Sequence, residues 1–259
     1  MAHAELPVLT MRRDAWWVQP AVTAIVFIAF IAYTTWAAFQ NAHYRFGPYL
    51  SPLYSPEFGK PGIWPAWLPF SPALLILPFP GLFRVTCYYY RGAYYKALWA
   101  DPPACTVHEP RKTYLGEQKF PLIMQNIHRY FMYIALIFLI ILAHDVWDAL
   151  WFTDPATGRV VFGIGVGTIV LAVNTTLLSC YALGCHSLRH IVGGYRDRLA
   201  GHPVQQTAYA CVSCFNRWHM KWAWMSLFFV AFADIYVRLC SMGVWHDWRI
   251  VSACPTTKR

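Results

Sequence analysis

The sequence predicts an all-α integral membrane protein, a helical bundle of five transmembrane helices. Hydrophobic residues make up 58% of its 259 residues and charged residues only 13%, whereas a soluble domain carries about 25% charged residues. One helical span takes about 20 apolar residues, and several apolar runs of that length are separated by polar or proline-rich connections. The chain therefore holds one bundle, a single domain over residues 1–259, with no room for a large soluble domain.

The first span is expected at residues 18–40, preceded by Arg12 and Arg13 and by a tryptophan pair at headgroup level. The start of the chain lacks an apolar stretch that ends in a small-residue cleavage site, so no signal peptide is expected. Residues 41–66 are rich in proline, glycine and aromatic residues, which disfavour a regular helix. They predict an ordered outer loop on the membrane surface.

The second span, at residues 69–92, is the least regular. Four prolines lie in its first half, and neighbouring helices must satisfy the carbonyl groups that prolines release within a membrane. We expect a kinked helix that continues into the cytoplasm, and the alternative is a re-entrant or interfacial segment. The following residues, 100–120, are polar and proline-rich and predict a loop.

Three further spans are expected at residues 121–151, 160–190 and 217–242. Pro121 suits a first helical turn, and the glycine pair 193–194 ends the fourth span. The connection between the fourth and fifth spans is basic and has room for a short surface helix. Five spans place the two termini on opposite sides of the membrane.

Basic residues outside the apolar runs predict the orientation. Thirteen of them lie on the side of the N-terminus, and six lie on the other side. The positive-inside rule then places the N-terminus in the cytoplasm and the C-terminus outside, in a multi-pass protein of the inner (cytoplasmic) membrane. The same rule explains the net charge of +9, and no basic soluble face suggests nucleic acid as a partner.

Cysteine and histidine residues gather at the predicted cytoplasmic ends of the spans. Imidazole and thiolate are ligands of iron centres, and helical bundles build such sites from side chains that project inward. His186 and His190 lie four residues apart, on one helical face. The pattern predicts a metal or haem centre in the inner half of the bundle, and two histidines with two cysteines would form a Rieske-like set.

Each of these residues also has an ordinary interpretation. A buried thiol acts as a small apolar group, and a histidine near a helix end can reach water or a lipid phosphate. Cys211 and Cys214 have the spacing of a zinc-binding pair, but no second pair is convincingly placed. Because Walker, Rossmann and nucleophile-elbow motifs are absent, the chain alone is not predicted to be a complete enzyme.

Polar groups at the inner membrane boundary predict a wedge for a quinone head group. A quinone needs an apolar slot with a few donors to its carbonyl oxygens, and the alternative is a set of interface aromatics with snorkelling arginines. At the outer end, Asp234 and Arg238 either form an i, i+4 pair or join His144 in a proton path. The candidate quinone-binding residues are Arg84, Tyr89, Asn126, Arg129 and Trp218.

Long stretches of the chain resemble the membrane-anchor (cytochrome b-like) subunit of the actinobacterial-type succinate dehydrogenase, the kind with a single large anchor. The resemblance covers about residues 17 to 243. It is carried by FRVTCYYYRGAYYKALWADPPAC, GEQKFPLIMQNIHRYFMYIAL, GCHSLRHIVGG and NRWHMKWAWMSLFFVAFADIYVRL, with PYLSPLYSPEF in the outer loop.

The resemblance implies a respiratory-chain complex in which a flavoprotein subunit and an iron–sulfur subunit dock on the cytoplasmic face. It leaves open whether several such complexes associate into a higher oligomer. The flavoprotein would oxidise succinate in the tricarboxylic acid cycle, and electrons would pass through the iron–sulfur subunit and this chain to menaquinone. Related anchors hold a Rieske-like [2Fe–2S] cluster. The resemblance does not decide which four residues would ligate the cluster. The candidate ligands that it implies are Cys87, Cys105, Cys185, His128, His186, His190 and His219.

Two departures keep alternatives open. The Cys-x-His and Cys-x-x-His pairs of soluble Rieske proteins are absent, so a cluster would need ligands from separate helices. Leu183 lies seven residues before His190, where a haem-ligating histidine is expected. This position argues against haem, although His128, His186 and His219 remain available as haem ligands. The first alternative is a dihaem (haem b) cytochrome b-type anchor, and the second is a membrane scaffold or small transporter without a redox centre.

Overall fold

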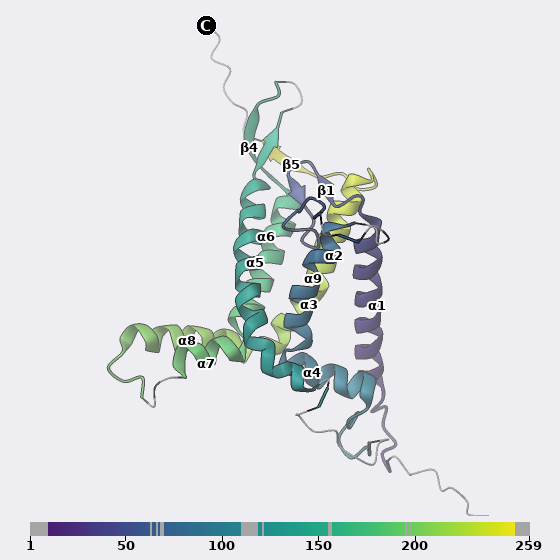
Figure 1. Ribbon diagram of the computed structural model, residues 1–259, viewed down its shortest axis with the longest axis vertical. Coiled ribbons are helices and arrows are strands. Elements are labelled where there is room, and N and C mark those ends of the chain that lie inside the picture. Colours follow the sequence, from purple (N-terminus) through teal and green to yellow (C-terminus); the bar gives the residue numbers. More distant parts are fainter. Residues whose placement is uncertain are drawn as a thin grey trace, which may run out of the picture. The chain divides into compact units, whose positions relative to one another are not determined.

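The computed structural model describes residues 10–62, 64–65, 67, 70–109, 119–120, 122–154, 157–194, 196 and 198–251. They are mostly helical (Figure 1). The chain forms two compact units. The first unit contains the described residues up to Tyr33 together with Leu82–His128, and the second contains Thr34–Gly81 and the chain from Arg129 onward.

Within the described residues, four helices are long and apolar enough to cross a membrane. Many of their apolar side chains face outward: Ile28 of the first helix is 59% exposed and Ile140 of the second is 72% exposed. Such surfaces are favourable against lipid and unfavourable against water. The four helices are α1 (Val18–Gln40), Ile123–Asp148, which joins the 3-10 turn η2 (Leu122–Ile127) to α5 (His128–Asp148), α6 (Val166–Leu183) and α9 (His219–Ser241).

The second apolar segment differs from the single kinked helix that the sequence predicts. Prolines break it, because a proline has no N–H to donate and suits only a first helical turn. Its apolar helical part, Pro72–Val85, is shorter than a span, so the structure shows four long apolar helices and a fifth span stays a prediction. The elements are α2 (Pro72–Ile76), α3 (Pro78–Val85), α4 (Tyr88–Tyr94) and the π-helical turn η1 (Tyr95–Trp99).

At one end of the second unit, short strands replace the helical ends that the sequence predicts. The third span ends at Asp148 instead of 151, and the fourth begins at Val166 instead of 160. A β1–β2 hairpin and an antiparallel β3–β4–β5 sheet occupy this end. The strands are β1 (Arg45–Phe46), β2 (Tyr49–Leu50), β3 (Trp151–Thr153), β4 (Val160–Gly165) and β5 (Arg249–Val251).

The core of the second unit lies between α6 and α9. Val170 of α6 packs against Ala233 and Tyr236 of α9, and the ring of Tyr181 stacks on His219. Residues early in α6 therefore meet residues late in α9, which makes the two helices antiparallel.

At the opposite end, α6 stops at Leu183, where the sequence predicts that the span continues to residue 190. A Cβ on Gly184 would lie 3.0 Å from the carbonyl oxygen of Phe215, so only glycine allows this close approach. Asn216 donates to the Gly184 carbonyl at 2.7 Å. The chain therefore turns out of α6 into α7 (His186–Gly193) and α8 (Pro203–Arg217), which run across the direction of α6 (Figure 1).

Candidate functional site

In the first unit, His128 is held at the start of α5. Its ring is 8% exposed and stacks on Phe83 with ring centroids 4.9 Å apart. Its Nδ1 lies 2.8 Å from the hydroxyl of Thr86, which donates its hydrogen to the Leu82 carbonyl at 2.6 Å. Together with the ring stacking, this contact fixes the position of the imidazole.

The turn between α3 and α4 lies next to the buried Tyr90 of α4. Cys87 is 3% exposed and forms the N-cap of α4. Arg84, half-buried, donates to the hydroxyl of the buried Tyr90 at 2.5 Å. Tyr89 is also half-buried, whereas Asn126 is exposed. Cys87 and His128 are thus the buried metal-ligand candidates of the first unit.

In the second unit, a histidine again begins a long apolar helix. His219, the first residue of α9, is 7% exposed and stacks on Tyr181 with centroids 4.9 Å apart. Cys185 is 1% exposed and its Sγ accepts the N–H of Ser187 at 3.4 Å, capping α7. Each unit therefore holds one buried cysteine and one buried histidine among the predicted ligands.

The other predicted site residues are more accessible. Cys105, His186 and His190 are exposed. The guanidinium of the half-buried Arg129 lies 3.5 Å from Nδ1 of His190. Trp218 is exposed, and the ammonium of Lys221 lies 4.0 Å from its ring centroid.

The side-chain types of the buried candidates suit a metal centre. Two thiols and two imidazoles are the donor set of a Rieske-type cluster. Within the described part of the chain, no three His, Cys, Asp or Glu side chains lie together in a group that could hold a metal ion. The ligand set stays a prediction.

Two buried polar clusters of the second unit hold its sheet end together. The Asp247 carboxylate accepts from the hydroxyls of Tyr49 and Tyr236, both at 2.8 Å, and from the N–H of Gly167 at 3.0 Å. The predicted pair of Asp234 and Arg238 is confirmed at 3.3 Å. The contacts of Asp247 join residues up to 198 positions apart, and no local sequence pattern indicates them.

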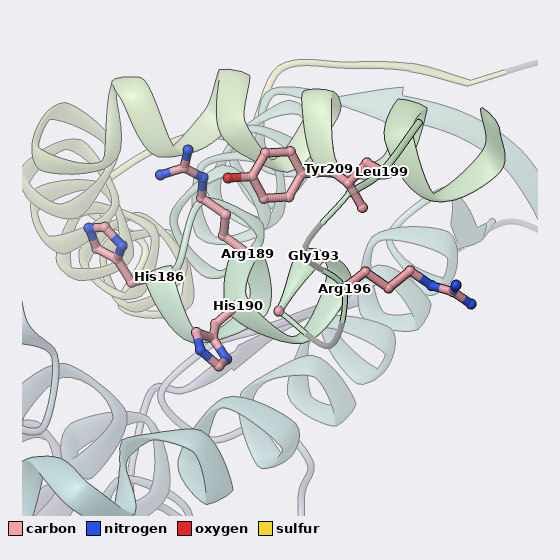
Figure 2. A pocket seen from close by; sticks show the side chains of 8 residues that line it. His186, Arg189, His190, Gly193, Arg196, Leu199 and Tyr209 are labelled. Carbon is pink, nitrogen blue, oxygen red and sulfur yellow. The ribbon is translucent and has the colours of Figure 1, made fainter. Parts of the chain in front are cut away.

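A pocket that the sequence does not predict lies on the hairpin of α7 and α8 (Figure 2). Its volume is about 390 Å³. The guanidinium of Arg189 stacks on the Tyr209 ring, 5.0 Å from its centroid, and Nε donates to Ser213 at 3.1 Å. Its lining residues are His186, Arg189, His190, Gly193, Gly194, Arg196, Leu199 and Tyr209.

Long apolar helices with outward-facing apolar side chains, together with buried imidazoles at helix starts, define a helical membrane subunit with candidate redox ligands. The family model of the actinobacterial succinate dehydrogenase subunit SdhC matches residues 18–243, and the chain belongs to this family. The resemblance found in the sequence is thereby confirmed.

A solved structure from Mycobacterium smegmatis, the Sdh1 complex in the apo form, contains a similar chain. The two chains are 39% identical, with a TM-score of 0.82 over 94% of this chain and 95% of that chain. No curated protein matches the sequence significantly.

Proposed function

We propose that this chain anchors a succinate dehydrogenase in the cytoplasmic membrane and passes its electrons to a quinone, menaquinone. The observation that carries the proposal is the family match over residues 18–243. The four apolar helices supply the membrane anchor. By its likeness to a chain of the Sdh1 complex, this chain assembles with a flavoprotein subunit, which oxidises succinate, and an iron–sulfur subunit.

The proposed orientation keeps the N-terminus in the cytoplasm and the C-terminus outside, because the basic connections then lie inside. This orientation requires the segment α2–α4 to carry the chain across the membrane. It predicts that a tag at the C-terminus is cleaved by protease added outside intact cells and not by protease added to inverted vesicles. Cleavage in the inverted vesicles alone would contradict it.

The proposed redox centre takes its ligands from the predicted cysteines and histidines. Among the predicted ligands, burial favours Cys87, His128, Cys185 and His219, because a metal site must exclude competing water. The exposed Cys105, His186 and His190 are weaker candidates for the same reason. A bound [2Fe–2S] cluster would supply one-electron transfer.

The second candidate centre is haem with two axial histidines. It is favoured by one observation: the two buried histidines, His128 and His219, each begin a membrane helix and stack on an aromatic ring. The quinone would be bound by the donors predicted from the sequence. Of these, Arg84 is fixed by Tyr90 and Arg129 lies near His190, while Tyr89, Asn126 and Trp218 are the remaining candidates.

Purified complexes carrying His128→Ala, His219→Ala, Cys87→Ser or Cys185→Ser test the proposal. We expect each variant to lose quinone reduction by about a hundredfold or more, as losses of redox ligands and their supports do, while succinate oxidation with a soluble dye persists. Cys214→Ser, at an exposed cysteine, is the matched control and should keep both activities. Full quinone reduction in all four variants would overturn the ligand assignment.

Cofactor analysis of the same preparations separates the two centres. The iron–sulfur subunit contributes its own iron, acid-labile sulfide and electron paramagnetic resonance signal, so a cluster in this chain would be established by the part of these that the native complex has and the four ligand variants lose. A Soret band that the histidine variants lose would establish haem. A complex that reduces quinone and contains neither in this subunit would contradict both.

A further inference from the structure

The hairpin of α7 and α8 has an uneven distribution of charge. Residues 203–216, nearly all of α8, contain no charged side chain, although Val204, Thr207, Cys211 and Cys214 are exposed. These four residues recur at intervals of three or four, so they share one face of α8. Apart from Arg217 at the end of α8, the arginines of the hairpin lie on α7 and in the loop that follows it, at positions 189, 196 and 198, with Asp197 between the last two.

The hairpin also lies where a membrane surface is expected. It connects the end of α6 to the start of α9, two of the candidate spans. At 8 and 15 residues, α7 and α8 are too short to cross a hydrocarbon core of about 30 Å. A helix that runs across the spans with an exposed, uncharged face is typical of one that lies in the interface of a bilayer.

The pocket between α7 and α8 carries positive charge. The guanidinium of Arg189 lies over the Tyr209 ring (Figure 2). Its Nε also donates to Ser213, and the two contacts fix the direction of the guanidinium. His186 and His190, one turn apart on α7, line the same pocket. Among the described residues that line it, none is acidic. A planar guanidinium beside imidazoles matches a phosphate oxygen pair better than it matches a neutral polar group.

We infer that this hairpin lies in the headgroup layer and that its pocket binds the phosphate of an anionic phospholipid. The uncharged face of α8 then meets the boundary of the acyl chains, and Arg189 contacts the phosphate. A free phosphate ion offers the same oxygen atoms. A lipid is the source to which we commit, because only a lipid also covers the exposed face of α8.

The first test measures lipid retention by the whole complex. Complexes reconstituted in nanodiscs of phosphatidylcholine with phosphatidylglycerol are extracted in mild detergent, and the lipids that remain bound are counted by native mass spectrometry. We expect Arg189→Gln to weaken phosphatidylglycerol retention about tenfold or more, since it removes a charge-assisted hydrogen bond. Arg198→Gln, the matched control, removes a charge from the same hairpin outside the pocket and should change retention by less than about twofold, because exposed surface charges contribute little.

Two results in this assay would overturn the inference. One is equal loss of phosphatidylglycerol in the two variants, which would show diffuse attraction by the hairpin's charge. The other is displacement of the lipid by millimolar inorganic phosphate added alone, which would identify a soluble anion as the occupant.

A second measurement tests the placement of α8 without any substitution. A negatively charged maleimide is added to vesicles, and labelling of Cys211 and Cys214 is compared with that of the chain unfolded in SDS. We expect both thiols to be protected at least about tenfold in vesicles, because the reagent must enter the apolar boundary. Labelling at the unfolded rate would place this face in water and contradict the inference.

Discussion

The two ends of the second unit use their polar side chains in different ways. At the sheet end, Asp247 accepts three hydrogen bonds and Asp234 pairs with Arg238, all within the chain. At the hairpin end, α7, α8 and their loop surround a pocket whose described lining residues include arginines and histidines and no carboxylate. Polar groups that satisfy one another hold the fold together, whereas cations arranged around a pocket indicate a ligand from outside.

Breaking the buried pair at the sheet end should have the largest effect. Arg238 is 5% exposed and Asp234 fully buried, so Asp234→Ala leaves a buried guanidinium without its carboxylate. We expect the free energy of unfolding to fall by about 3–5 kcal/mol. Thermal unfolding of the purified complex, followed by tryptophan fluorescence in one detergent, measures the loss.

The pair of His144 and Asp148 on α5 is the matched control. Its atoms are also 3.3 Å apart with i, i+4 spacing, but its side chains are 69% and 55% exposed. Asp148→Ala should cost less than about 1 kcal/mol. Equal destabilisation by the two variants would mean that the buried pair contributes no more to stability than the exposed pair.

The tyrosines around Asp247 should show a smaller effect. Tyr49→Phe removes one of the donors to this carboxylate, and we expect a loss of about 1.5–3 kcal/mol, the usual range for a hydrogen bond to a charged group. Tyr236→Phe should cause a similar loss. In the double variant, the loss of unfolding free energy should differ from the sum of the two single losses, because both hydroxyls donate to the same carboxylate. Strict additivity would contradict a shared network.

The buried Tyr49 should also make the stability of the fold depend on pH in the alkaline range. Burial, followed by the neighbouring Asp247, raises the pKa of Tyr49 above its ordinary value. The folded protein therefore keeps this proton at a pH where the unfolded chain loses it, so stability falls as the pH rises above about 10. The loss of unfolding free energy between pH 9 and about 11 should be smaller in Tyr49→Phe, and equal pH profiles would show that Tyr49 does not contribute.

The long helices of the fold were predictable because lipid imposes a simple rule on them. A span must be apolar over about 20 residues, and α1, α5, α6 and α9 carry this pattern in consecutive residues. The end of α6 was not predictable, since the turn at Gly184 depends on the approach of Phe215 from a later helix. The breaks within the segment α2–α4 were not predictable for a related reason, because proline content indicates a break without fixing where the chain resumes its helix.

The sequence predicted which residue types the candidate site contains, but not which of those residues are buried. Cysteine and histidine content indicated the chemistry, but the division into buried His128 and His219 and exposed His186 and His190 depends on tertiary packing. The hairpin pocket was missed because its arginines looked like a basic loop. Its structure depends on Arg189 stacking on Tyr209, 20 positions later in the chain.

The smallest predicted effect sharpens the comparison at the hairpin end. A Cβ on Gly193 would lie 2.5 Å from Cδ2 of Tyr209, so Gly193→Ala must shift the ring on which Arg189 rests. We expect a local destabilisation of about 1–3 kcal/mol, typical of overpacking, seen as faster hydrogen exchange in α7 and α8 while the sheet end keeps its protection. Gly81→Ala is the control, because a Cβ there meets nothing within 4 Å and alanine favours a helix. Slowed or unchanged exchange in both variants would show that α7 and α8 are not packed through Gly193 and Tyr209.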